Sequence, residues 1–150
     1  MNASNSLRLL ATAFALALAA CNNPPPPQLG QPAPVLYLTG QEYYSTGGKN
    51  FVRYNYDVLN KDAYAPDMFA AAPALPPCGL NTNSSRTWVD FFESNGTRIY
   101  GFCSLGAPAD LGRIWFAKEE GVVPPSWVYI EMTDRQTNAK YKSNLAETTP

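Results

Sequence analysis

The chain has 150 residues, a formal net charge of −1 and no histidine. Without imidazole it cannot form Ser-His-Asp or Cys-His nucleophile systems, zincin helices or most transition-metal sites, since these use histidine as base or ligand. The balanced charge, with no basic run, argues against nucleic acid as a partner. We therefore expect no cofactor, no metal site and no enzymatic activity.

Residues 1–20 have the features of a bacterial signal peptide. Arg8 is the one charged residue among them, and an apolar run broken only by Thr12 extends from Leu9 to Ala20. The run is shorter than the ~20 apolar residues of a transmembrane helix. It suits the core of a signal peptide, so the segment is expected to direct export and to be removed.

The apolar run ends in Leu18-Ala19-Ala20-Cys21, which resembles the lipobox of bacterial lipoproteins. In proteins with that motif the cysteine sulfur is lipidated and the signal is cut just before it. The resemblance implies a membrane-anchored lipoprotein, held through Cys21 and facing the periplasm or the cell surface. The alternative is a soluble secreted protein that is cut nearby, with Cys21 left as a free thiol.

Residues 21–34 are rich in proline and are expected to link the lipid anchor to a folded domain. Proline fixes φ and favours the extended polyproline conformation, which makes a semi-rigid spacer of roughly 3 Å per residue. A polyproline docking motif is the alternative. The folded domain is expected at residues 35–145, followed by a disordered tail at 146–150.

Seven short strands are expected in this domain, with no long helical pattern. In the clearest, at residues 51–59, Val52, Tyr54, Tyr56 and Val58 alternate with polar residues, as in a half-buried antiparallel strand. The strands predict an all-β fold, an antiparallel β-sandwich of immunoglobulin-like or fibronectin-III-like architecture. The other strands are expected at 35–44, 88–93, 98–103, 113–118, 127–133 and 139–143.

A β-hairpin is predicted around Asn95-Gly96, the preferred dipeptide of a two-residue type I′ turn, in which both residues have positive φ. This turn fixes the register of the two strands and places Phe92 opposite Ile99. The same register gives four further pairs: Glu93 with Arg98, Phe91 with Tyr100, Val89 with Phe102, and Trp88 with Cys103.

The connection at residues 60–86 shows no strand pattern. A short helix is expected at 66–72, because Pro66 suits a first helical turn and Pro73 ends it. Met68 and Phe69 would then close one end of the sandwich, and a lid over a ligand is the alternative. Elsewhere, a single helical turn is expected at 108–111, and a turn closed by a left-handed Asn138 at 134–138.

Three cysteines in an exported protein leave one unpaired. Lipidation of Cys21 would account for the odd one and leave Cys78 and Cys103 to form a disulfide in an oxidising compartment. That bond would tie the 60–86 connection to the hairpin. By loop-closure entropy it would stabilise the fold by roughly 3–4 kcal/mol.

The polar loop after Cys78 is the candidate binding surface. A disulfide would hold its amides and hydroxyls in place, which favours recognition. Alternatively, these side chains satisfy their own backbone in Asx and Ser/Thr turns. The loop residues concerned are Asn81, Thr82, Asn83, Ser84 and Ser85.

Two further sets of residues have a functional and a structural interpretation. Five aromatic residues could form a platform for sugar rings, although core packing is the commoner role. Paired carboxylates could hydrolyse glycosides, but no pair has a diagnostic spacing. Asp90 lies within a predicted strand opposite Gly101, where a backbone or arginine partner is expected. The aromatic residues are Tyr43, Tyr44, Trp115, Trp127 and Tyr129.

From Pro77 to the last strand the chain resembles a widespread class of bacterial exported domains to which no activity is assigned. The resemblance rests on Pro-Pro-Cys-Gly at 76–79, Asn-Thr-Asn at 81–83, Arg-Thr-Trp-Val-Asp at 86–90 and Tyr-Gly-Phe-Cys at 100–103. It implies export and a sandwich fold. The expected function is a non-catalytic module that binds an envelope protein or a glycan; a small carboxylate-dependent hydrolase and a purely structural lipoprotein are the alternatives.

Overall fold

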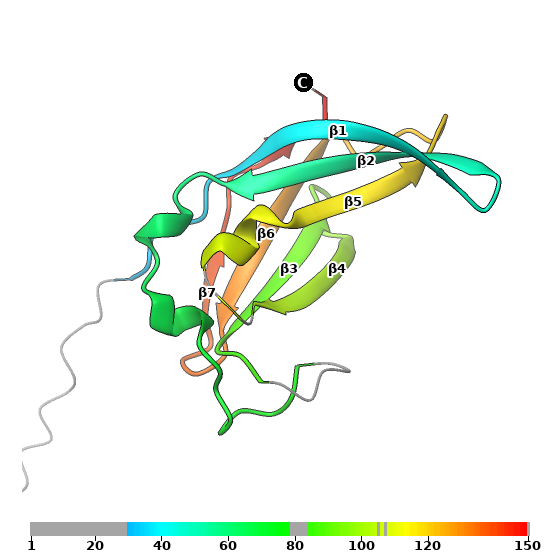
Figure 1. Ribbon diagram of the computed structural model, residues 1–150. Coiled ribbons are helices and arrows are strands. Elements are labelled where there is room, and N and C mark those ends of the chain that lie inside the picture. The colour runs from blue at the N-terminus through cyan, green and yellow to red at the C-terminus, as the bar shows by residue number, and fades with distance from the viewer. Residues whose placement is uncertain (1–29, 79–83, 105, 107, 150) are drawn as a thin grey trace, which may run out of the picture.

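The computed structural model describes residues 30–78, 84–104, 106 and 108–149, in which eight strands form two facing antiparallel sheets (Figure 1). The first sheet has the order β1 (Leu36–Thr46), β2 (Lys49–Val58), β5 (Ile114–Glu119). The second has the order β4 (Arg98–Ser104), β3 (Thr87–Glu93), β6 (Trp127–Asp134), β7 (Ala139–Lys142), and β8 (Ala146–Glu147) also pairs with β6.

The all-β sandwich expected from the sequence is confirmed. The second strand pairs with the fifth in one sheet and the third pairs with the sixth in the other, as in immunoglobulin-like sandwiches. The fourth strand lies beside the third and does not join the sheet of the fifth. As a result β4 and β5 are both edge strands, one in each sheet, and their free edges lie on the same side of the sandwich.

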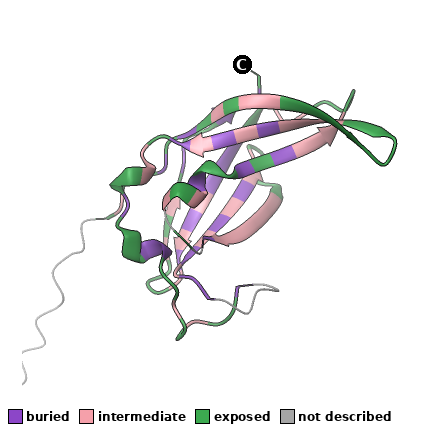
Figure 2. Ribbon diagram, viewed as in Figure 1, coloured by how far each residue is buried: buried purple, intermediate pink, exposed green. Residues whose placement is uncertain are grey.

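The core lies between the sheets, where buried side chains alternate along β2, β3 and β5 (Figure 2). On β2, Tyr54, Tyr56 and Val58 are buried, as their alternation predicts. The ring of Tyr56 meets that of Phe91 on β3 edge-on, with centroids 5.4 Å apart. Such aromatic contacts across the two sheets contribute beyond the area they bury, by roughly 0.5–1.5 kcal/mol each.

Short 3₁₀ turns cover one end of the sandwich: η1 (Lys61–Ala63), η2 (Pro66–Phe69) and η3 (Pro108–Gly112). The helix expected at 66–72 is thus a single 3₁₀ turn. Met68 and Phe69 are buried, as predicted. The turn at 134–138 is also as predicted, with Asn138 at φ 61°.

The predicted type I′ turn between β3 and β4 is wrong. Only Gly96 in this turn has positive φ, at 89°, and the Glu93 N–H donates to the Thr97 carbonyl at 2.9 Å. The turn is therefore a three-residue loop with a glycine bulge. A competing bond explains the change, because Asn95 Oδ1 accepts the Thr97 N–H at 2.8 Å.

The three-residue loop shifts the register near the tip by one residue, so that Phe92 pairs with Arg98. The predicted pairs of Phe92 with Ile99 and of Glu93 with Arg98 are therefore wrong. A second irregularity follows between Phe91 and Phe92, where Ile99 is the extra residue on β4. It restores the predicted register: Phe91 with Tyr100, Val89 with Phe102, and Trp88 with Cys103.

The disordered tail expected at 146–150 is wrong for the residues that the structure describes. Ala146 and Glu147 form β8, and both Ala146 and Thr148 are buried. Thr148 holds this segment in place, since its N–H donates to the Ser126 carbonyl at 3.2 Å and its hydroxyl to the Pro125 carbonyl at 2.5 Å. A two-residue strand is too short to show an alternating pattern in the sequence.

Candidate functional site

The predicted binding loop is only partly described, because Asn81, Thr82 and Asn83 lie outside the described residues. Ser84 and Ser85 are buried, so the prediction that they present hydroxyls to a ligand is wrong. The Ser84 hydroxyl donates to the Ala72 carbonyl at 2.6 Å, and that of Ser85 donates to the Ser104 carbonyl. Ser85 therefore fastens the 72–86 connection to β4, whereas Ser84 joins the two ends of that connection.

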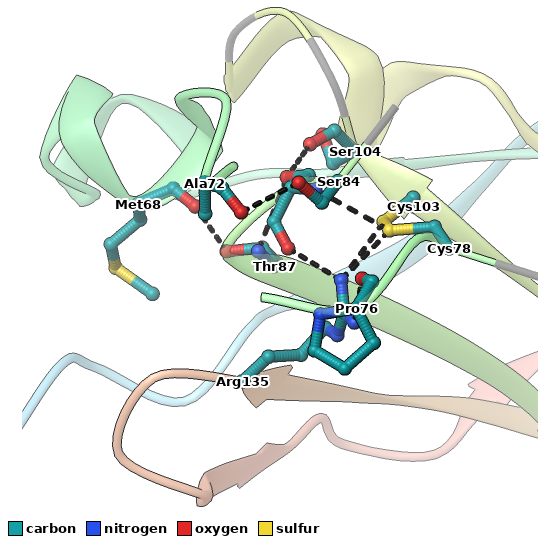
Figure 3. Close-up of a disulfide and its surroundings, with 10 residues drawn as sticks. Met68, Ala72, Pro76, Cys78, Ser84, Thr87, Cys103, Ser104 and Arg135 are labelled. Carbon is teal, nitrogen blue, oxygen red and sulfur yellow. Dashed lines mark hydrogen bonds between the residues drawn. A yellow bond between two sulfur atoms is a disulfide. The ribbon is translucent and has the colours of Figure 1, made fainter. Parts of the chain in front are cut away.

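Cys78 and Cys103 form a disulfide, with their Cα atoms 5.9 Å apart (Figure 3). Arg135, in the turn after β6, lies against this bond. Its Nη1 donates to Cys78 Sγ at 2.9 Å and to the Ser85 carbonyl at 2.8 Å, while Nη2 donates to the Pro76 carbonyl at 2.6 Å. No local sequence pattern marks this arginine, because its partners lie more than 30 residues away in the chain.

Arg86 forms ion pairs with two carboxylates, those of Asp134 and Asp67, and all three residues line one cleft. Arg86 donates to Asp134 through Nε at 3.0 Å and Nη2 at 2.8 Å, and through Nη1 to Asp67 at 3.0 Å. Burial raises the pKa of Asp134, but hydrogen bonds from Arg86 and from the Gln136 N–H hold that pKa below its usual value. The general acid of a glycosidase needs a raised pKa, so the lowered pKa of Asp134 does not suit that role.

Asp90 has the arginine partner expected from the sequence, since Arg98 Nε donates to its Oδ1 at 2.6 Å. Gly101, opposite Asp90, leaves the room for this pair, because a Cβ there would collide with both side chains. Asp90 therefore forms a structural ion pair on the outer face of the second sheet.

The five aromatic residues do not form one platform. Tyr129 is buried and stacks on Phe92, with ring centroids 5.0 Å apart. Trp127 lies beside β8, at the edge of the sandwich opposite to β4 and β5. The other three surround a hollow at the first sheet: Tyr43, Tyr44 and Trp115.

An apolar groove of about 600 Å³ lies between β4 and β5. Tyr100 and Phe102 point from β4 into the space between the sheets, and Trp115 comes from β5. We call this hollow the β4–β5 groove and define it by its lining residues: Ile99, Tyr100, Phe102, Cys103, Asp110, Arg113, Trp115, Phe116 and Ala117. The sequence identifies these residues as members of strands, but not as neighbours across the two sheets.

The free edge of β5 faces the groove. The Trp115 N–H donates to the Tyr100 hydroxyl at 3.1 Å, so it points away from β2. Backbone groups in a strand alternate in direction, and the N–H and C=O of Ala117, two residues on, therefore point to the same free edge. Burial raises the pKa of Tyr100, which keeps the hydroxyl protonated.

The charged residues of the groove differ in their contacts. Asp110 caps a turn, since its carboxylate accepts the Gly106 N–H at 3.0 Å and lies 3.3 Å from the Ser104 hydroxyl. Arg113 is exposed and forms no ion pair with any residue that the structure describes. Arg113 is thus the charge at the groove that is available to a partner.

Trp115 forms one wall of the groove and is 41% exposed. The guanidinium carbon of Arg53 lies 4.3 Å from the centre of its ring. This contact is a cation–π interaction and helps to hold the indole at the edge of the first sheet. Trp115 also lines the hollow beside Tyr43 and Tyr44, so it separates that hollow from the β4–β5 groove.

No protein-family model matches the chain, and no similar protein was found among curated proteins or solved structures. Within the described ranges, no group of three or more His, Cys, Asp or Glu could hold a metal ion. Over the same ranges, no helix is long and apolar enough to cross a membrane. The function is therefore inferred from the geometry of the chain itself.

Proposed function

We propose that this chain is an exported, lipid-anchored protein of the bacterial cell envelope, and that its β-sandwich is a non-catalytic module that binds another protein in the β4–β5 groove. The signal-like segment 1–20 and the lipobox-like Cys21 support the anchor. The proline-rich segment before the domain would hold it away from the membrane. The spacer predicted at 21–34 is wrong at its last residues, because Pro34 is buried and the Tyr64 hydroxyl donates to the Pro32 carbonyl at 2.9 Å. A disulfide between Cys78 and Cys103 is in keeping with an oxidising compartment.

The observation that carries the binding proposal is an apolar groove that runs beside the free edge of a strand. An extended peptide there would pair its backbone with Ala117 and place alternate side chains against Phe102 and Trp115. Arg113 would bind an acidic side chain or a carboxylate of the same peptide. The groove thus offers all three elements of strand addition: edge hydrogen bonds, side-chain pockets and a charge.

A glycan is the second candidate, because the exposed ring of Trp115 could stack on a sugar. Sugar hydroxyls need polar partners once they leave water. At the groove, Asp110 and the Tyr100 hydroxyl are already engaged within the domain. The lining therefore favours a protein segment over a glycan.

The carboxylate-dependent hydrolase is the weaker alternative, since the lowered pKa of Asp134 does not suit a general acid. A purely structural lipoprotein is a further alternative, and it requires no ligand in the groove. The proposal predicts a polypeptide bound next to Ile99 in cells, whereas the structural alternative predicts no bound molecule there.

The experiment places a photoreactive amino acid at Ile99 in the full chain, in cells. The matched control has it at Tyr37, which lines a hollow of about 450 Å³ at the opposite edge. We expect a discrete polypeptide adduct from Ile99 and none from Tyr37. The substitution Trp115→Ser should remove the adduct, because it removes one wall of the groove.

Three outcomes would count against the proposal. Equal adducts from both positions would mean that the groove has no selectivity. No adduct together with Trp115-dependent binding of purified glycans would favour the glycan candidate. Turnover of any substrate by the purified Cys21→Ser chain in a broad hydrolase screen would show that the module is catalytic.

A further inference from the structure

The two sulfur atoms of the disulfide lie in different surroundings. Cys78 is buried, with 5% of its surface exposed. Cys103 is half-buried in β4 and lines the β4–β5 groove. A thiol that approaches from solvent therefore reaches Cys103 before it reaches Cys78.

Hydrogen-bond donors are concentrated on the buried sulfur. Cys78 Sγ accepts from Arg135 Nη1 at 2.9 Å and from the Ser85 N–H at 3.4 Å (Figure 3). The same guanidinium nitrogen lies 3.9 Å from Cys103 Sγ. A negative charge on Cys78 would thus be stabilised more strongly than one on Cys103.

Arg135 is held in this position independently of the sulfur atoms. The carbonyls of Pro76 and Ser85 accept hydrogen bonds from its guanidinium, and the backbone N–H of Arg135 donates to the Arg86 carbonyl at 2.7 Å. The neighbouring Asp134 is bound by Arg86, so it does not neutralise Arg135. The cation is therefore in place before any charge develops on Cys78.

We propose that this disulfide is a site of directed thiol–disulfide exchange, attacked at Cys103 by an external thiolate with Cys78 as the leaving group. The attacking sulfur forms a bond to Cys103 Sγ as the Cys78–Cys103 bond breaks. The bonding pair moves to Cys78 Sγ, which leaves as a thiolate beside Arg135 and the Ser85 N–H.

A second external thiolate completes the reduction. It attacks the external sulfur of the mixed disulfide, which releases Cys103 as a thiolate and leaves the two external sulfurs joined. The reductant is thus two monothiols or one dithiol, and it is oxidised to a disulfide. The 72–86 connection then keeps its serine hydrogen bonds but loses its covalent tie to β4.

The first test reads which cysteine is attacked. The full chain with Cys21→Ser, made in an oxidising compartment, is treated with glutathione, quenched with acid and alkylated. Peptide mass spectrometry should find glutathione on Cys103 and the alkyl group on Cys78, in an excess of about tenfold over the reverse. Glutathione mainly on Cys78, or equally on both, would overturn the proposal. So would a disulfide that does not react at all while the chain is folded.

The second test separates stabilisation of the thiolate from simple packing. Arg135→Gln should slow reduction by glutathione about three- to tenfold, because the leaving thiolate loses its cation. Arg135→Lys should recover part of the rate, and Lys49→Gln, which removes a cation from the other sheet, should leave the rate unchanged. If Arg135 only packed against the connection, its loss would expose the disulfide and speed reduction. Unchanged or faster reduction in Arg135→Gln therefore contradicts the proposal.

Discussion

The sandwich has two edges at which the sheets end, and they differ in how their backbone groups are used. At the edge formed by β1 and β8, the Asn144 side chain acts in place of a paired strand. Its Oδ1 accepts the Leu36 N–H at 2.8 Å, and its Nδ2 donates to the Leu36 carbonyl at 3.0 Å. Gln41 adds a bond to the Thr148 carbonyl at 3.0 Å.

At the edge formed by β4 and β5, the bond from the Trp115 N–H to the Tyr100 hydroxyl bridges the two sheets. The rest of that edge is the apolar groove, and the backbone N–H and C=O of Ala117 point into it. Proteins usually protect free strand edges, since these can pair with other chains. Side chains can thus satisfy the free backbone groups at an edge of this fold, as Asn144 does for Leu36. Within the described part of the chain, the backbone groups of β5 that face the groove have no such cover beyond the bond at Trp115, and we call that edge open.

The largest effect is expected from Asn144→Leu at the closed edge. It leaves both polar backbone groups of the buried Leu36 without their partner, which should lower the free energy of unfolding by about 3 kcal/mol. Urea denaturation measures this loss, provided that the dependence of the unfolding free energy on urea concentration is the same in both chains. A loss well below 1 kcal/mol would mean that Asn144 does not close this edge.

A smaller loss is expected when the chain is ended after Leu145. This removes β8 and the bonds of Thr148, and should cost about 2 kcal/mol. Urea denaturation of the shortened and full-length chains gives the difference. Equal stability would show that residues 146–150 behave as the tail that the sequence predicts.

At the open edge, Tyr100→Phe should cost no more than about 1 kcal/mol, because water can replace the lost hydroxyl at the rim of the groove. Thermal unfolding of Tyr100→Phe and Asn144→Leu, measured in parallel, compares the two edges directly. A loss as large as that of Asn144→Leu would mean that both edges are closed by comparable bonds, which removes the contrast between them.

The smallest effect on stability is expected from Arg113→Gln, within about 0.5 kcal/mol, because the side chain is exposed and unpaired among the described residues. The same substitution should weaken the Ile99 adduct severalfold if the bound peptide is acidic. The yield of adduct at equal expression is the measurement. An undiminished adduct would remove Arg113 from the site.

Much of the fold follows from local patterns. Alternation along residues 51–59 predicts which face of β2 is buried, and the Asn95-Gly96 pair predicts the hairpin. The turn type was mispredicted, because Asn95 bonds to the Thr97 N–H in place of adopting positive φ. Local propensity thus identifies the strands and most of the register.

The candidate site could not be predicted in the same way. Ile99 and Trp115 are neighbours only because β4 pairs with β3, and strand order depends on contacts that are distant in sequence. The polar loop at 81–85 is prominent in the sequence, yet its last two residues are buried by bonds to Ala72 and Ser104. Polar composition does not tell whether a hydroxyl faces solvent or a buried carbonyl.

The most direct test of the open edge is the pair Ala117→Pro and Ala117→Ser, read by the adduct at Ile99. Proline removes the N–H that faces the groove and is tolerated on an edge strand, whereas serine keeps that N–H. If an extended peptide adds to β5, the adduct disappears with proline and persists with serine, while both variants stay folded by circular dichroism. An adduct that persists with proline would contradict strand addition at this edge.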